Sequence, residues 1–268
     1  MMGKSRKIVI WGLITGLLVA ALGCGNVDLA DLNLETIEVG ELQREKYTTE
    51  LGDADEVRTT IRMGAGTLEI AGGAEELLEA DFLYNVADLK PEVEYTVGQL
   101  TIRQPRYEKI PFNKDVRYEW DLRFNDEVPM DLRINFGAGN ADIDVSTLSV
   151  TTLDMKLGAG DVELNAQDNR TLERIEIDMG AGDVQLDLRG AWTSDVDVTI
   201  QGGVGNMTLR LPQDLGVHVD VSKGVGGVNA HGFRIDGDDY VNDAYETADA
   251  IIYVTIQAGI GQINLKLD

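Results

Sequence analysis

Apolar and polar residues alternate along most of the chain from Val57 onward. The residues around one Gly-Ala-Gly triplet illustrate the pattern. Every second position is apolar before the triplet, at Leu153, Met155 and Leu157, and again after it, at Val162 and Leu164. Alternation with a period of two predicts β-strands that bury one face. The same pattern recurs to the end of the chain, so we predict an all-β protein.

Each stretch of alternation is interrupted by a Gly-x-Gly (GxG) triplet, and the parity of the apolar positions changes there. After the triplet the apolar residues begin three positions beyond its centre, as from Ala159 to Val162. On a flat strand this slip would turn the second half toward solvent. The chain is therefore predicted to bend or bulge at the triplet, which glycine permits. The predicted corner glycines are Gly64, Gly66, Gly137, Gly139, Gly158, Gly160, Gly180, Gly182, Gly203, Gly205, Gly259 and Gly261.

The triplets recur at a nearly fixed spacing. Successive leading glycines at 137, 158, 180, 203 and 224 are 21, 22, 23 and 21 residues apart. This period predicts a single-stranded β-helix, or β-solenoid, with about 21–23 residues per turn, in which stacked turns bury one another. A sandwich of β-hairpins is the competing architecture. It favours Asn-Gly or Asp-Gly turns, and only Asp236-Gly237 occurs.

The pattern divides the chain into segments. The regular repeats cover 137–268 and are interrupted by an acidic insertion at 232–250, and an irregular part covers 51–136. Between Gly64 and Gly137 there is room for about three further turns, one of them near 97–102. Before these lie a leader at 1–23 and a charged tether at 24–50, so the ectodomain is predicted to span 51–268.

The leader predicts lipid anchoring. A positive start is followed by the uncharged apolar run 8–23, which is shorter than the roughly 20 residues of a membrane span. The only cysteine, Cys24, follows directly after a glycine and resembles the acylated cysteine of a bacterial lipobox, although Leu22 is bulkier than usual. We expect a lipid on Cys24 to hold the protein on the outer face of a membrane in the bacterial cell envelope. An ordinary leader or a retained anchor is the alternative.

The charge of the chain excludes one class of partner. Its formal net charge is −24. Nucleic-acid binding requires a basic face, so no nucleic-acid partner is predicted.

The repeated phrase, LGAGDVELN at 157–165 and MGAGDVQLDL at 179–188, resembles the toast-rack family of bacterial envelope proteins. This is an adhesin-like group that includes LiaF-like C-terminal domains. The earlier run MGAGTLEIAGGAEELLEADF resembles the N-terminal part of the same family, and together the matches cover roughly Leu51–Asp268. The resemblance implies a right-handed β-helix with a non-enzymatic role in adhesion or envelope stress. It implies no catalytic residue and no cofactor.

Two alternatives involve carboxylates. Stacking would align Glu69, Asp142, Glu163, Gln185, Thr208, Asn229 and Asn264 in one outward column. Asp142 beside Glu163 could act on a polysaccharide, because glycoside hydrolysis uses paired carboxylates. The insertion offers weak calcium candidates in Asp236, Asp238, Asp239 and Asp243, which otherwise form a solvated acidic loop.

The irregular segment 82–124 is the predicted ligand-binding region. It holds most of the aromatic residues and the one locally basic run of the ectodomain, and its candidate ligand-binding residues are Tyr107, Phe112, Tyr118, Trp120, Arg106 and Arg117. Aromatic faces with basic neighbours suit a glycan or an envelope protein as partner. The alternative is a cap whose aromatic side chains pack against the end of the solenoid.

Overall fold

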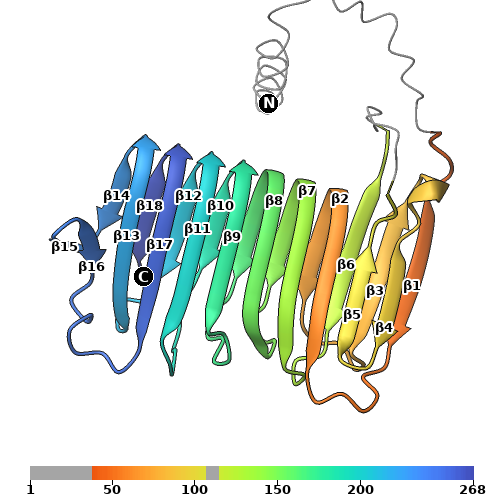
Figure 1. Cartoon of the computed structure of the whole chain (residues 1–268), viewed down its shortest axis with the longest axis horizontal. Coiled ribbons are helices and arrows are strands. Elements are labelled where there is room, and N and C mark those ends of the chain that lie inside the picture. Colours follow the sequence, from red (N-terminus) through yellow and green to blue (C-terminus); the bar gives the residue numbers. More distant parts are fainter. Residues whose placement is uncertain (1–37, 107–114) are drawn as a thin grey trace, which may run out of the picture. The chain divides into compact units, whose positions relative to one another are not determined.

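The computed structural model describes residues 38–106 and 115–268, and this part of the chain is all-β (Figure 1). Its strands form one open eighteen-stranded sheet. The only helix among the described residues is the 3₁₀ turn η2 (Ala87–Leu89). The strands are β1 (Gln43–Thr49), β2 (Val57–Ala71), β3 (Leu78–Tyr84), β4 (Glu92–Thr96), β5 (Gln99–Arg103), β6 (Tyr118–Phe124), β7 (Met130–Asp144), β8 (Val150–Asn165), β9 (Arg174–Ala181), β10 (Val184–Asp187), β11 (Val196–Val204), β12 (Met207–Leu211), β13 (Gly216–Val225), β14 (Val228–His231), β15 (Arg234–Asp236), β16 (Asp239–Val241), β17 (Ile251–Ile260) and β18 (Ile263–Leu267).

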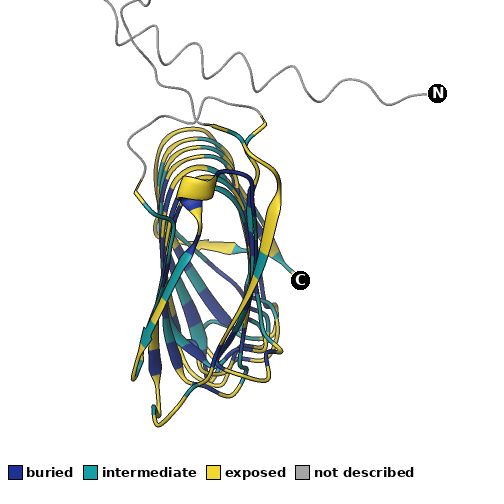
Figure 2. Cartoon of the chain, turned by 90° about the vertical axis from the view of Figure 1, so that its right-hand side faces the viewer, coloured by how far each residue is buried: buried dark blue, intermediate teal, exposed yellow. Residues whose placement is uncertain are grey.

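The sheet folds into two facing layers, which Figure 2 shows from one end of the stack. The first layer contains the strand segments before each GxG triplet, in the spatial order β4, β5, β2, β7, β8, β9, β11, β17 and β13. The second layer contains the segments after it, in the order β1, β3, β6, β2, β7, β8, β10, β12, β18 and β14. The repeating turns pair in parallel. Every antiparallel pair among the described strands involves β1, β3, β4, β15 or β16: the pairs are β1–β3, β3–β6, β4–β5, β13–β16 and β15–β16. This is a solenoid-like arrangement, since each turn contributes to both layers.

The core lies between the two layers and is built from columns of equivalent apolar residues. In the first layer one column contains Ile61, Ile134, Met155, Ile177, Ile200 and Ile256, none of which is exposed. In the second layer another column contains Leu68, Ala141, Val162, Val184, Met207 and Ile263, each at most 3% exposed. The alternation that predicts half-buried strands is therefore confirmed on both sides of the triplets.

The glycines of the triplets lie against one another in adjacent turns. Gly160 has a φ of +136°, and a Cβ there would lie 1.8 Å from the carbonyl oxygen of Gly139 in the neighbouring turn. The second glycines of the other triplets have the same positive φ, between +133° and +154°. Any side chain at this position would be strained and would collide with backbone, so only glycine fits.

The turns do not stack entirely in chain order at the C-terminal end. The last turn, β17 and β18, lies between the turn of β11 and β12 and the turn of β13 and β14. Its apolar residues Ile256, Ile263 and Leu265 are buried, whereas Val221 and Val228 in the outer turn are half-buried. The more apolar turn occupies the interior because covering it on both sides removes more apolar surface from water.

The N-terminal side also differs from the expectation. β2 pairs directly with β7, so the residues between them do not form three further turns of one stack. They form a single split turn, β5 and β6, on the other side of β2, and β3 and β4 pair with it in antiparallel fashion. The predicted tether also ends too late, because β1 (Gln43–Thr49) already pairs with β3. Antiparallel pairing of distant segments leaves no period in the sequence, so it was not anticipated.

Within 38–106 and 115–268, no helix has the length and apolar character needed to cross a membrane. The leader at 1–23 and Cys24 lie outside the described residues.

Candidate functional site

The predicted ligand-binding aromatic residues form part of the core. Trp120 is 1% exposed and Tyr118 is 4% exposed, so neither can contact a ligand at the surface. That prediction is wrong for these two residues, because β6 lies between β2 and β3 and turns both side chains inward. Arg106 is exposed, and Arg117 is exposed with its Nε 3.1 Å from Glu119 Oε1. Tyr107 and Phe112 lie outside the described residues.

These aromatic side chains close the N-terminal end of the core. Trp120 packs edge-on against Phe82, with ring centroids 5.4 Å apart. The Tyr118 hydroxyl donates a hydrogen bond to the Leu89 carbonyl at 2.7 Å, and burial raises the pKa of Tyr118. The packing matches the cap that was the alternative interpretation of this segment.

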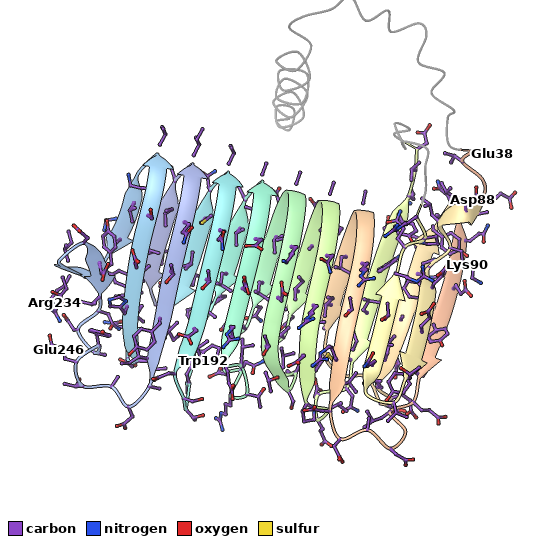
Figure 3. All side chains as sticks on the ribbon, in the orientation of Figure 1. Glu38, Asp88, Lys90, Trp192, Arg234 and Glu246 are labelled. Atoms are coloured by element: carbon purple, nitrogen blue, oxygen red, sulfur yellow. The ribbon has the colours of Figure 1, made fainter. Side chains whose placement is uncertain are left out.

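The acidic insertion folds onto the C-terminal end of the stack. Asp236 and Asp239 pair across the hairpin of β15 and β16, while Asp238 and Asp243 are exposed. Asp239 Oδ2 lies 3.1 Å from His218 Nε2 on β13. Figure 3 labels Arg234 and Glu246 at this end, and they form an ion pair at 3.0 Å. In the part of the chain that the structure describes, no three His, Cys, Asp or Glu residues are arranged to hold a metal ion.

His218 of β13 has aromatic neighbours from the insertion and from β17. Its ring lies 5.3 Å from the ring of Tyr245 and 6.0 Å from that of Tyr253. Nearby, the buried Asn242 donates hydrogen bonds to the carbonyls of Gln213 and Leu215 and accepts one from the Val217 amide. These contacts explain why the insertion is attached to the stack rather than forming a loop in solvent.

A polar hollow of about 390 Å³ lies on the outer face of the second layer, across β7, β8, β10 and β12. Two rows of side chains cross it, because equivalent positions of parallel strands lie in register. The first row is Asp142, Glu163, Gln185 and Thr208, and the second is Asp144, Asn165, Asp187 and Arg210. The turn residues Gln167 and Arg189 complete its lining. We call this site the polar hollow.

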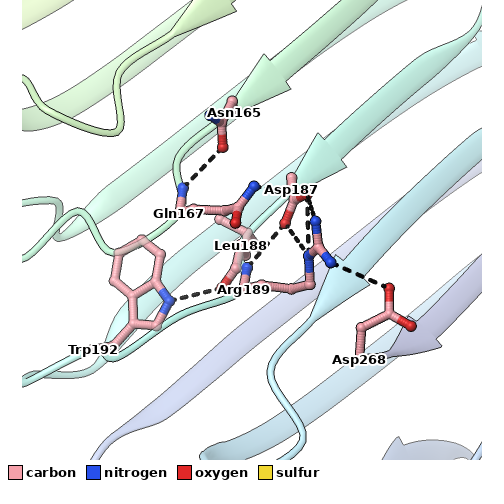
Figure 4. Close-up of polar contacts among 7 residues, drawn as sticks. All are labelled: Asn165, Gln167, Asp187, Leu188, Arg189, Trp192 and Asp268. Atoms are coloured by element: carbon pink, nitrogen blue, oxygen red, sulfur yellow. Dashed lines mark hydrogen bonds and ion pairs between the residues drawn. The ribbon is translucent and has the colours of Figure 1, made fainter.

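The Asp187–Arg189 pair holds the centre of the hollow in place (Figure 4). Arg189 donates from Nε and Nη2 to the Asp187 carboxylate, at 2.9 and 2.7 Å, and Gln167 Nε2 donates to the same carboxylate at 3.1 Å. Burial alone would raise the pKa of Asp187, but the hydrogen bonds and charge of Arg189 outweigh it and lower the pKa. Asp187 is therefore ionised and largely neutralised by its partner.

Carboxylates gather at the β7 and β8 side of the hollow. The predicted outward column is confirmed by the register, with Asn264 placed between Thr208 and Asn229. Glu69 of β2 lies directly beside Asp142, and Glu163 lies on its other side. No ion pair involves any of these three carboxylates within the described ranges 38–106 and 115–268. The sequence placed Glu69 in the same column but not directly beside Asp142, because further turns were expected between them.

A second, shallower groove of about 880 Å³ follows the leading glycines of five turns in the first layer. Lys156, Asp178, Gln201, Gln257 and Ser222 line it on one side. Lys156 and Asp178 form an ion pair at 3.8 Å. The floor is bare backbone, because glycine leaves no side chain there.

The architecture defines a class of protein: a solenoid-like stack in which successive turns of the chain pair through parallel β-strands and the glycine triplets lie in register. The chain belongs to the toast-rack family. The family model described as the N-terminal domain of toast_rack, DUF2154, matches residues 38–171 and 167–210.

Among solved structures, the chain is 30% identical to a "putative cell adhesion protein" from Clostridium sporogenes ATCC 15579, with a TM-score of 0.65. The match covers 85% of this chain and 100% of that one. A "putative adhesin" from Bacteroides fragilis NCTC 9343 is 11% identical, with a TM-score of 0.34, over 86% of this chain and 99% of that one. A "putative adhesin" from Parabacteroides distasonis ATCC 8503 is 11% identical, with a TM-score of 0.32, over 86% of this chain and 100% of that one. These two are too distant to support a functional argument. No curated protein matches the chain.

Sequence reasoning missed the basic side of the polar hollow. Arg210 lies two positions after Thr208, so the repeat itself assigns it to the second row. Arg189 follows β10 in a turn, where the period gives no orientation. Its place became visible only through its contact with Asp187.

Proposed function

We propose that the protein is a non-enzymatic, adhesin-like binding module displayed on the bacterial cell surface and anchored by a lipid on Cys24. The observation that supports this best is the 30% identity to a "putative cell adhesion protein" across that protein's whole length. The leader that ends at Cys24 supports the anchor. In this role the GxG triplets are the corners of a solenoid whose two flat layers present repeated outward rows to a partner.

The anchor is tested by comparing wild type with Cys24→Ala. Cells are fractionated, and the protein is followed in membrane and soluble fractions, with incorporation of labelled fatty acid as a second measurement. We expect the variant to leave the membrane fraction and to take up no label. Unchanged retention and labelling would contradict the lipid anchor.

Display is tested separately on intact cells. Added protease should degrade the ectodomain of the wild type without lysis, and cells that carry it should adhere to an envelope-coated surface more than cells that carry Cys24→Ala. Equal adherence with confirmed surface exposure would contradict the adhesive role while leaving the anchor in place.

An enzyme acting on polysaccharide is the second candidate, because Asp142 and Glu163 lie on adjacent strands at the same hollow. Neighbouring strands are about 4.8 Å apart, close to the carboxylate separation of about 5–5.5 Å used by retaining glycosidases. It predicts glycan cleavage by the purified protein that Glu163→Gln abolishes. Our proposal predicts no cleavage by either protein.

A further inference from the structure

The polar hollow has opposite charges at its two sides and uncharged groups between them. On the β7 and β8 side, Asp142 and Glu163 are exposed and make no ion pair with any described residue. On the β12 side, Arg210 is exposed and likewise forms no ion pair within 38–106 or 115–268. Lys266 of β18 extends the basic side, because it lies beside Arg210 in the register.

The centre of the hollow is suited to amide groups rather than to charge. Gln185 and Thr208 follow the two carboxylates in the first row, and Asn165 lies beside Asp187 in the second. Asp187 itself forms an ion pair with Arg189, which Figure 4 shows, and accepts a hydrogen bond from Gln167. Arg210 lies beside it in the register and its charge also lowers the pKa of Asp187. Side-chain amides and hydroxyls offer both donors and acceptors, which is what the backbone of an extended peptide requires.

The distance between the charged sides sets the size of a ligand. Glu163 and Arg210 are separated by two strand steps, from β8 through β10 to β12. At about 4.8 Å per step this is about 10 Å across the strands, and Arg210 also lies two residues, or about 7 Å, further along its strand than Thr208, the residue level with Glu163. The two residues are therefore about 12 Å apart, a length that an extended chain of three to four residues spans.

We propose that the polar hollow binds a short zwitterionic peptide, about three to four residues long, with its ammonium group beside Asp142 and Glu163 and its carboxylate beside Arg210. The peptide crosses the strands, so it does not add a strand to the sheet. The Asp187–Arg189 pair keeps the centre ordered before binding, which lowers the entropy cost of ordering the site. This inference rests on the proposed binding role and assigns it a ligand class.

The test uses the purified full-length protein in detergent and triglycine as the probe. Binding is measured by NMR from the ligand signals, alongside N-acetyl-triglycine, which lacks the ammonium group, and triglycinamide, which lacks the carboxylate. We expect each change to weaken binding by about two- to fivefold, the range of an exposed ion pair. Equal binding of all three peptides, or no binding of triglycine, would overturn the proposal.

Two variants locate the contacts. Glu163→Gln should reduce the difference between triglycine and N-acetyl-triglycine, because only Asp142 then remains beside the ammonium group, and Arg210→Gln should remove the difference between triglycine and triglycinamide. Both side chains are exposed, so neither change should disturb folding, and an unchanged melting temperature checks this. Arg133→Gln, exposed on the first layer, is the matched control and should leave all three affinities unchanged.

Competition by a sugar also tests the ligand class. If cellobiose competes with triglycine as well as the peptides do, the hollow recognises hydroxyl groups and the proposal is wrong. The titration uses purified protein, so its failure would leave membrane retention and surface display untouched. Unchanged membrane retention of Cys24→Ala, which would contradict the anchor, would equally leave the titration valid.

Discussion

Lys223 donates a hydrogen bond from Nζ to the carbonyl oxygen of Gly226, at 2.8 Å. This lysine occupies a core-facing position, since the equivalent residues in other turns are Phe136, Leu157, Met179, Gly202 and Ala258. It lies in the outermost turn, where the upper part of β13 has no further strand beside it within the described chain. A charged residue that faces inward on an edge strand discourages pairing with another chain.

We therefore expect Lys223→Leu to promote end-to-end association. The variant would add an apolar side chain beside Val225, which is already 70% exposed. Sedimentation velocity should show a larger average mass for the variant than for the wild type at the same concentration. Lys156→Leu, on an interior strand, is the control. An unchanged mass for Lys223→Leu would show that the lysine does not protect this end.

The glycine triplets predict that the loss of stability caused by a Gly→Ala substitution depends strongly on its position. Gly160→Ala should lower the free energy of unfolding by about 3 kcal/mol or more, because strain at a φ of +136° adds to a collision with Gly139. Gly237 also has a positive φ, of +65°, but a Cβ there meets nothing within 4 Å. Gly237→Ala should therefore cost only about 1–2 kcal/mol. Urea denaturation measures both, and equal losses would refute the role of close packing between turns.

The Asp187–Arg189 pair predicts a pH dependence. Because the pKa of Asp187 is lowered in the folded protein, its stabilisation is complete above the ordinary pKa of about 4 and is lost as the pH falls through the folded value. Asp187→Asn should lower stability at pH 7 by about 1.5 kcal/mol, the worth of a charge-assisted hydrogen bond. The difference between wild type and variant should shrink toward pH 2. Urea denaturation across this range tests it, and a pH-independent difference would contradict it.

The row of carboxylates predicts that removing a charge stabilises the protein. Asp142 lies between Glu69 and Glu163, and like charges on adjacent strands repel. Asp142→Asn should raise the free energy of unfolding by about 0.2–1 kcal/mol at low salt. The gain should fall in 1 M salt, where the screening length is about 3 Å. Asp53→Asn, in an exposed turn, is the control, and a destabilised Asp142→Asn would show that the row has an attractive partner.

The features that could be predicted from the sequence are those that follow from a periodic pattern of residues. The all-β class follows from alternation, and the aligned column through Asp142 and Glu163 follows from the repeat, because parallel strands in register bring equivalent residues together. The prediction was wrong for Tyr118 and Trp120, because the aromatic and basic composition of segment 82–124 suggested a binding surface. Aromatic residues are equally suited to both roles, and only the position of β6 between two strands decides for burial.

The sequence by itself determined the strands, the glycine positions and the family, since each depends on local spacing that the chain carries in its own order. The tertiary structure alone decided which turns are neighbours: the last turn lies inside the stack, and β2 lies beside β7. Every turn carries the same pattern of strand residues, so the pattern does not specify which turn pairs with which. The amount of apolar surface that each turn must bury does so, and with it the places of Lys223 at the open end and of Arg210 beside Asp187.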